Sequence, residues 1–216
     1  MQIPIVYDDE NMVVIDKPAG ILAHPVKDEK NTLIDLMRQK YPEIQLVHRL
    51  DQDTSGLMVM AKNQKTAEFL KEQFKNRQIK KKYSALVHGI LKDKHGIIAK
   101  SISKSRKRGG SQTIAPIGKM REAVTRYDVL KEYKNFSFLE ARPETGRTHQ
   151  IRVHLASIGH PIAGDKKYKF KRQISPQGLN RQFLHASYLK FNLPNGKIME
   201  FNSELPNDLQ EVLKKL

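Results

Sequence analysis

Two short apolar runs limit the folds that are open to this chain. Met12-Val13-Val14-Ile15 and Leu57-Met58-Val59-Met60 each place four apolar residues in a row, bounded by polar residues or glycine. Uninterrupted apolar runs of this length are typical of buried strands, whereas a helix on a protein surface repeats its apolar residues with a period of 3.6. The two runs therefore predict two buried strands.

Four segments carry helix signals instead. Thr32, Asn63 and Thr148 each precede an apolar pattern of helical period and are residue types that favour the N-cap position. Pro42 would end the first of these helices, and Gly159 the third. The predicted helices span residues 32–41, 63–74, 148–158 and 206–216.

Strands and helices do not alternate regularly along the chain. Residues 83–87 and 125–130 alternate apolar and polar side chains, as half-buried strands do, so the expected strands outnumber the helices. This order predicts an α+β fold with a mixed, largely antiparallel sheet. A length of 216 residues is enough to bury a core, and there is no linker, repeat or low-complexity tract. We expect one domain over residues 1–216.

The chain carries a large excess of positive charge. It has 39 Lys and Arg against 23 Asp and Glu, a formal net charge of +16. The bases cluster in residues 71–82, 100–108 and 165–172, with no acidic block to balance them. A single cluster could be only a solvated surface, but three together favour a polyanionic partner. Nucleic acid is the first candidate, and an acidic membrane surface is the second.

The residue types and motifs that the sequence lacks exclude several kinds of site. The sequence has no Cys, which rules out disulfides, a thiolate nucleophile and zinc fingers and fits a reducing cytoplasm. It has no GxxxxGK[ST] or GxGxxG motif to hold a nucleotide. His149 and His154 are five residues apart, so they do not share a helix face as the zinc motif HExxH requires. No apolar window approaches 18 residues. We expect a cytoplasmic protein with no metal, no cofactor and no membrane partner.

Reactive and polar side chains concentrate in residues 47–56 and 145–154. The first segment contains Asp51 close to Arg49, and a guanidinium beside a carboxylate keeps that carboxylate ionised. An ionised carboxylate suits a nucleophile or a base. A turn residue bridged to Arg49 is an equally good interpretation of Asp51, and Asp53 fits better as the residue that starts a DTSG turn.

The first of these segments belongs to a longer pattern. HRLDQDTSGLMVMAKN, residues 48–63, resembles the catalytic motif of the RluA-type pseudouridine synthases, in which His-Arg-Leu-Asp precedes Thr-Ser-Gly. Four more blocks are similar to that family and occur in its order: VYDDENMVVIDKPAGILAHP (6–25), KKKYSALVHG (80–89), GRTHQIRVHLASIGHPIAGDKKY (146–168) and FLHASYLKF (183–191). The resemblance therefore covers nearly the whole chain at several separated motifs.

This resemblance implies roles for five residues. Asp51 matches the catalytic aspartate, and Arg152 matches the arginine that pairs with it. Tyr83 matches the tyrosine that stacks on the target base, and Leu184 the apolar position that packs against that base. Arg49 matches an arginine that helps to fill the space left by a flipped-out nucleotide. The histidines near these positions, His48, His149 and His154, are expected to support the site through hydrogen bonds.

The implied activity is an isomerisation of uridine in RNA, in which the N-glycosidic bond is broken and the base is re-attached through carbon. A carboxylate can serve by adding to the base or by acting on the sugar. The base must leave the stack to react, which fits an apolar and aromatic pocket. The implied fold is an α+β pseudouridine synthase domain with a central active-site cleft. We expect structured ribosomal or transfer RNA as the partner, no DNA, and a monomer.

The resemblance begins at the catalytic domain of that family, so we expect no N-terminal RNA-binding extension. The basic surface of the catalytic domain would then hold the RNA backbone. Residues 100–121 match no family motif and are expected to form an RNA-contacting loop, with a mobile part around residues 108–111.

Two other functions stay open at this point. The first is a non-catalytic RNA-binding protein that has kept the fold, which turnover would exclude. The second is a hydrolase that cleaves glycosidic bonds with Asp51 and Asp53 as a carboxylate pair, which would release uracil.

Overall fold

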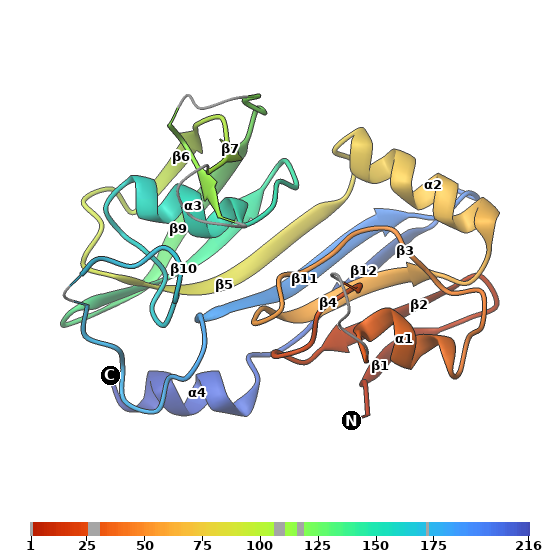
Figure 1. Cartoon of the computed structure of the whole chain (residues 1–216), viewed down its shortest axis with the longest axis horizontal. Helices are drawn as coiled ribbons and strands as arrows, with labels where there is room; N and C mark the ends of the chain where they lie inside the picture. Colours follow the sequence, from red (N-terminus) through yellow and green to blue (C-terminus); the bar gives the residue numbers. More distant parts are fainter. Residues whose placement is uncertain (1, 26–30, 106–110, 116–118, 172) are drawn as a thin grey trace. The chain divides into compact units, whose positions relative to one another are not determined.

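Both apolar runs of the sequence form buried β-strands, as predicted, and the two strands are neighbours in the sheet. In the computed structural model, residues 12–15 belong to β2 (Met12–Lys17) and residues 57–60 belong to β4 (Ser55–Ala61). The two strands pair antiparallel, with Val14 opposite Val59, and both of these side chains are fully buried. The structure describes residues 2–25, 31–105, 111–115, 119–171 and 173–216, and these group into two units (Figure 1).

Unit 1 comprises Met1–Lys80 and Ala186–Ser203. Its strand order is β1-β2-β4-β11; β12 pairs with β11, and β3 pairs with β4. The further elements are β1 (Ile5–Asp8), β3 (Gln45–Leu46), β11 (Leu184–Asn192), β12 (Ile198–Asn202), α1 (Leu33–Arg38) and α2 (Gln64–Lys75). Residues of α2, β2, β4 and β11 share one apolar cluster, so the helix packs on the sheet.

Unit 2 comprises Lys81–His185 and Glu204–Leu216. Its main sheet has the order β5-β10-β9-β6, and β7 and β8 form a separate two-stranded sheet. The strands are β5 (Lys80–His88), β6 (His95–Ala99), β7 (Ser103–Lys104), β8 (Gln112–Thr113), β9 (Val124–Tyr133) and β10 (Phe136–Pro143). The helices are α3 (Gln150–Ser157) and α4 (Asn207–Lys214), and residues of both belong to the apolar cluster of this unit.

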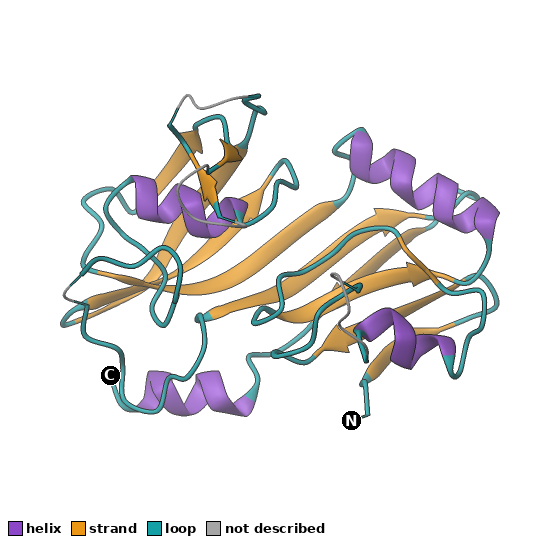
Figure 2. Cartoon of the chain, in the orientation of Figure 1, coloured by secondary structure: helices purple, strands orange, loops and turns teal. Residues whose placement is uncertain are grey.

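The predicted α+β class is confirmed. Strands make up most of the regular structure in both units (Figure 2), and every strand pair with a described register is antiparallel. Within the described ranges, no helix has the length and apolar character needed to cross a membrane. Of the stretch expected to be mobile, residues 108–111, the first three lie outside the described residues, and Ser111 is buried.

Three of the four helix starts follow the sequence signals. Thr32 is the N-cap of α1, and Asn63 caps α2 by accepting the Thr66 amide at 2.9 Å. Pro206 precedes α4, as expected for a helix over residues 206–216. Helix α1 ends at Arg38, earlier than the predicted Tyr41, because the Lys40 and Tyr41 amides both bond the Met37 carbonyl in a terminal turn.

The start of α3 differs from the prediction. Its N-cap is His149, with a left-handed φ of 55°, and not Thr148. The Gln150 side chain organises the preceding loop, since its Oε1 accepts hydrogen bonds from the Arg147 amide (3.0 Å) and the Thr145 hydroxyl (2.6 Å). The exposed Thr148 side chain does not hold this loop. Residue type alone therefore predicted an N-cap one position before the observed one.

Candidate functional site

Asp51 lies in a tight turn of unit 1, directly before β4. The turn is closed by the backbone, because the Thr54 amide donates to the Asp51 carbonyl at 3.1 Å. Leu50, which is 4% exposed, anchors the turn in the core, and the Asp51 side chain is half-buried. The carboxylate is therefore held by a fixed backbone while it keeps access to solvent.

Lys17, the last residue of β2, fixes this turn. Its side chain is fully buried, and its Nζ donates to the carbonyls of Pro18 (2.7 Å), Ile21 (3.0 Å) and Gln52 (3.0 Å). The Gly20 amide also donates to the Gln52 carbonyl, at 2.9 Å. Three carbonyls match the three donors of an ammonium group, which makes a buried lysine tolerable here. Lys17 thus positions the backbone next to Asp51.

Two basic side chains flank this turn. His48 accepts the Val59 amide on its Nε2 at 3.0 Å and stacks on Phe74 with ring centroids 4.5 Å apart. It therefore ties the turn to β4 and α2 through the kind of hydrogen bond that was predicted. Arg49 is exposed and donates to Nε2 of His24 at 3.0 Å. The Arg49 guanidinium is therefore at the surface beside the turn, held by a single described side-chain contact.

Tyr83 and Leu184 belong to one apolar cluster of unit 2. Tyr83 is half-buried on β5, opposite Ala141 of β10, and Leu184 is 4% exposed at the start of β11. Phe183 and Ile151 are members of the same cluster. Both side chains that the resemblance assigned to a pocket for the base therefore contribute to the apolar core of unit 2, and their role at the base stays a prediction.

Arg152 forms a buried ion pair with Asp165. Its Nε and Nη2 donate to the two carboxylate oxygens at 2.6 and 2.9 Å, and the two side chains are only 7% and 0% exposed. The carboxylate also accepts the amides of Lys167 (2.8 Å) and Tyr168 (3.1 Å). Burial alone raises the pKa of Asp165, but the hydrogen bonds and charge of Arg152 lead to a pKa below its usual value. The pair is therefore charged and fixes the guanidinium in place.

Tyr168 links this ion pair to the start of α3. The Arg152 guanidinium lies over its ring, 5.2 Å from the centroid. The Tyr168 hydroxyl accepts the Gln112 amide at 2.7 Å and lies 2.8 Å from Nδ1 of His149. One side chain thus connects β8, the N-cap of α3 and the Arg152–Asp165 pair.

His154 is a buried histidine of α3 with both ring nitrogens in hydrogen bonds. Its Nε2 donates to the Lys100 carbonyl and its Nδ1 accepts from the Thr125 hydroxyl, each at 2.9 Å. Burial lowers the pKa of His154, and the hydrogen bond to Lys100 opposes this shift only in part. The neutral ring therefore supports unit 2 through hydrogen bonds, in line with the prediction.

The low pKa of His154 predicts acid-sensitive stability. The unfolded chain binds this proton near pH 6.5 and the folded protein only at lower pH, so the free energy of unfolding falls as pH drops below about 6.5. His154→Gln should cost about 1–3 kcal/mol at pH 8 and make the decline toward about pH 5 shallower. Urea unfolding of both proteins across this range measures the effect. His95→Gln, a change at an exposed histidine of β6, is the control, and equal slopes for His154→Gln and wild type would contradict the assignment.

The five predicted site residues fall into two groups. Asp51 and Arg49 lie in unit 1, whereas Tyr83, Arg152 and Leu184 lie in unit 2. The pairing of Asp51 with Arg152 and the central cleft would each join the two units, and both stay predictions. Across the described ranges, no group of three or more His, Asp or Glu side chains is arranged to hold a metal ion.

Three residues near the predicted site had no role in the sequence analysis: Lys17, Asp165 and Tyr168. Charge patterning placed Asp165 and Tyr168 in the basic cluster at residues 165–172 but gave neither a contact with Arg152, and no pattern pointed to Lys17. All three lie inside the blocks at residues 6–25 and 146–168 that resemble the family, which was the available signal. Their contacts with Gln52, Arg152 and Gln112 join segments that are distant in sequence.

Comparisons with known sequences identify the family of this chain. Residues 11–157 match the family described as RNA pseudouridylate synthase. An uncharacterized RNA pseudouridine synthase of Bacillus subtilis (strain 168), YlyB, is 37% identical over 227 residues, which cover 100% of this chain and 73% of that protein. Ribosomal large subunit pseudouridine synthase C of Haemophilus influenzae is 36% identical, over 98% of this chain and 68% of that protein.

Solved structures give the same result for the fold. Human RNA Pseudouridylate Synthase Domain Containing 1 has a TM-score of 0.82 at 26% identity, over 98% of this chain and 87% of that chain. Human RNA Pseudouridylate Synthase Domain Containing 4 has a TM-score of 0.80 at 28% identity, over 98% of this chain and 92% of that chain. With sequence motifs, family match and fold in agreement, the chain belongs to the RNA pseudouridylate synthase family, in the RluA-type group that its motifs predicted.

Proposed function

We propose that this protein isomerises specific uridines to pseudouridine in structured RNA, with Asp51 as the catalytic carboxylate. Family membership makes the protein an isomerase that acts on RNA. The observation that carries the proposal is the family match over residues 11–157, which includes Asp51, Tyr83 and Arg152 within their motifs. The fixed turn that presents Asp51 supports its role, because a catalytic group needs a defined position.

The reaction exchanges one bond to the sugar for another. The bond between N1 of uracil and C1′ of the ribose breaks, a bond between C5 and C1′ forms, and the proton on C5 is released to solvent. N1 takes up a proton, so atoms and charge balance without an oxidant or a reductant. Asp51 would act as nucleophile or base, and the resemblance pairs it with Arg152, which would keep it ionised.

Side chains of unit 2 are suited to hold the flipped base. Tyr83 offers an aromatic face, and Leu184 contributes an apolar surface to the same cluster. Aromatic and apolar contacts of this kind hold a base that has left its stack. The Arg152–Asp165 pair keeps a guanidinium fixed on α3, where no rotamer search is needed on binding.

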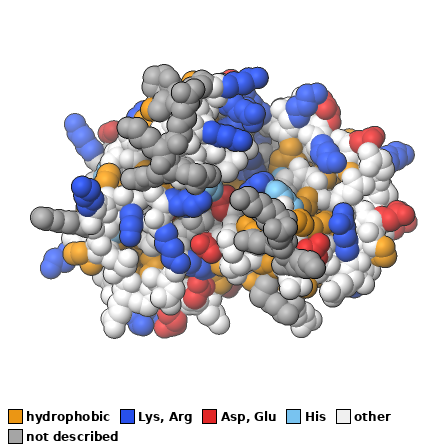
Figure 3. Space-filling view, viewed as in Figure 1, with side chains coloured by type: hydrophobic (Ala, Val, Ile, Leu, Met, Phe, Trp, Pro, Cys, Tyr) orange, Lys and Arg blue, Asp and Glu red, His pale blue; other side chains and the backbone are white. Residues whose placement is uncertain are grey.

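The surface charge supports a large RNA as substrate. Lys and Arg side chains outnumber Asp and Glu on the face of unit 2 that Figure 3 shows, and the whole chain has a net charge of +16. Relatives named ribosomal large subunit pseudouridine synthase make large-subunit ribosomal RNA the first substrate to test, with transfer RNA as the second. We propose that the protein acts on this RNA as a monomer in the cytoplasm.

Tritium release tests the function directly. The substrate is an unmodified transcript of large-subunit ribosomal RNA that carries tritium at C5 of its uridines. Re-attachment of the base through C5 releases this label to water, so we expect tritiated water and an equal amount of pseudouridine in the digested RNA. Transfer RNA prepared in the same way is the second arm.

The same digest separates the other functions. A hydrolase would leave abasic sites and free uracil that retains its tritium, which would overturn the proposal. A protein that binds both RNAs tightly but releases no label from either would be a non-catalytic RNA-binding protein.

A further inference from the structure

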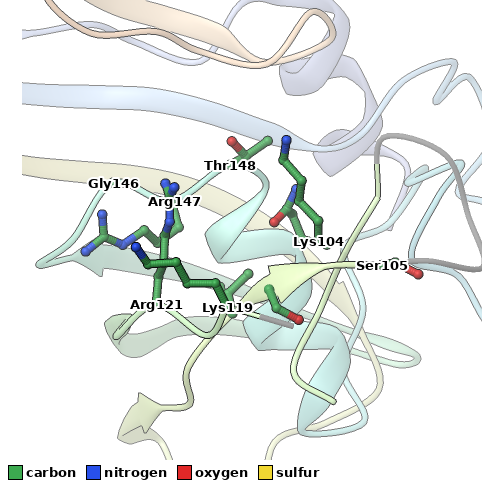
Figure 4. Close-up of a pocket in the computed structure, with 10 residues that line it drawn as sticks. Lys104, Ser105, Lys119, Arg121, Gly146, Arg147 and Thr148 are labelled. Atoms are coloured by element: carbon green, nitrogen blue, oxygen red, sulfur yellow. The ribbon is translucent and has the colours of Figure 1, made fainter. Parts of the chain in front are cut away.

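Unit 2 contains a basic pocket that is lined by none of the residues proposed to act in catalysis or in binding of the base. The pocket has a volume of about 370 Å³ and is lined by β7, by Gln112 of β8, by the segment before β9 and by residues 146–148 before α3. Figure 4 shows that its labelled side chains come from segments far apart in the sequence. Part of residues 100–121, which matched no family motif, thus becomes part of a defined site.

Four cations line this pocket: Lys104, Lys119, Arg121 and Arg147. No Asp or Glu is among the lining residues. Within the described part of the chain, none of the four cations has an ion pair with a carboxylate, although nearby Arg126 and Arg142 both have one. Four like charges around one cavity repel each other, and a bound anion removes that repulsion.

Backbone and core contacts hold the pocket walls in place. Ile102 and Arg121 exchange two backbone hydrogen bonds, at 2.8 and 2.9 Å. Ile102 is 2% exposed and shares a small apolar cluster with Val153 of α3 and with Tyr168. The Gln112 amide is bound to the Tyr168 hydroxyl. The cations therefore stand on a scaffold tied to the helix that carries Arg152, which lowers the ordering cost of binding.

The polar groups that line the pocket and the volume of the pocket indicate which kind of anion it can bind. Arg121 and Arg147 supply planar guanidinium groups, which match phosphate oxygens, and Lys104 and Lys119 supply point charges. Ser105 and Thr148 add hydroxyl groups to the lining, whereas the Ser103 hydroxyl donates to the Ala115 carbonyl at 3.3 Å. A cavity of about 370 Å³ is in the size range of small-molecule sites, so it has room for a phosphate together with an attached sugar.

We propose that this pocket binds a phosphodiester group of the substrate RNA and thereby sets the position of the RNA strand relative to α3. This inference rests on the proposed function, because the phosphodiester is taken to belong to the RNA that is modified. The contact is independent of sequence, as phosphate contacts are, and positions the strand while other groups select the uridine.

A matched pair of double variants tests the pocket. Lys104→Gln/Lys119→Gln removes two pocket cations whose side chains form no described hydrogen bond. Lys92→Gln/Lys134→Gln removes two exposed lysines of the same unit that do not line the pocket. Both variants change the net charge equally. Thermal unfolding confirms that each is folded, and Arg147→Gln alone is the substitute if the pocket variant is not.

Binding is measured with an unmodified transcript of large-subunit ribosomal RNA over a range of salt concentrations. We expect the Kd of the pocket variant to be about tenfold above that of the control variant. The slope of log Kd against log salt should be smaller by about 1 than that of the control, because about one phosphate contact is lost. Equal Kd values and equal slopes for the two variants would overturn the proposal.

Two further outcomes separate RNA binding at the pocket from catalysis and from binding of free phosphate. One outcome is that wild type releases no tritium while the pocket variant still binds the RNA more weakly than the control variant does. In that case the proposed activity is wrong and the proposed RNA binding at the pocket is supported. Inorganic phosphate alone is the other probe. If it raises the Tm of wild type but not of the pocket variant, and both variants bind RNA alike, the site takes free phosphate and the assignment to RNA is wrong.

Discussion

Asp51→Asn should lower tritium release by at least about 10³-fold while RNA binding is kept. The amide has nearly the shape of the carboxylate but cannot act as a nucleophile or a base. The backbone contacts of the turn are unchanged by this substitution, since the Asp51 carbonyl accepts the Thr54 amide and Lys17 holds the Gln52 carbonyl. RNA affinity should stay equal or rise slightly, because a negative charge is lost. Single-turnover tritium release and an RNA binding titration measure the two effects.

Asp53→Asn is the matched control for this experiment. It makes the same chemical change two residues further along the same loop, at another half-buried side chain. We expect its turnover to stay within a few fold of wild type. If both variants lose turnover equally, a carboxylate pair is favoured over a single catalytic aspartate, and turnover by Asp51→Asn at the wild-type rate would remove Asp51 from its proposed role.

Asp165→Asn should destabilise the protein by about 3–5 kcal/mol and also lower its activity. The change removes the negative charge that faces the Arg152 guanidinium at 2.6 Å in a region where both side chains are buried. An amide oxygen can still accept the Lys167 and Tyr168 amides, so the loss reports mainly on charge. Urea unfolding and tritium release measure the two effects. Asp128→Asn breaks a much more exposed pair with Arg142 and should cost less than about 1 kcal/mol.

A double variant separates stability from activity at this pair. In Arg152→Gln/Asp165→Asn both charges are removed together, so no unpaired buried charge remains, and the amide oxygen at position 165 still accepts the Lys167 and Tyr168 amides. We expect stability to recover but not tritium release, because the guanidinium assigned to Asp51 is absent. Recovery of both would show that Arg152 is only structural.

Much of the fold could be predicted from local patterns. The runs at residues 12–15 and 57–60 formed buried strands because four apolar residues in a row can be hidden only in the interior of a sheet or a core. Asn63 capped α2 because its side chain reaches the Thr66 amide within the same turn. In both cases the deciding contacts are made within a few residues or by whole apolar faces.

The α3 start and the end of α1 show where local patterns fall short. Thr148 has the better N-cap side chain, yet His149 takes the position because Gln150 holds the preceding loop and Tyr168, 19 residues away, contacts His149. Helix α1 stops at Arg38 because the amides that follow it, those of Lys40 and Tyr41, share the Met37 carbonyl. Terminal turns depend on such competing hydrogen bonds, which residue type does not reveal.

The sequence by itself determined the α+β class, the family and Asp51 as the candidate carboxylate. Strand periodicity and motif order depend only on the linear order of the residues. Tertiary structure decided which groups surround these motifs. Lys17 reaches the turn of Asp51 across 35 residues, and Arg152 finds Asp165 13 residues away. The four cations of the basic pocket come from three segments. Charge and hydrogen bonding act through space, so only the path of the folded chain determines which distant groups meet.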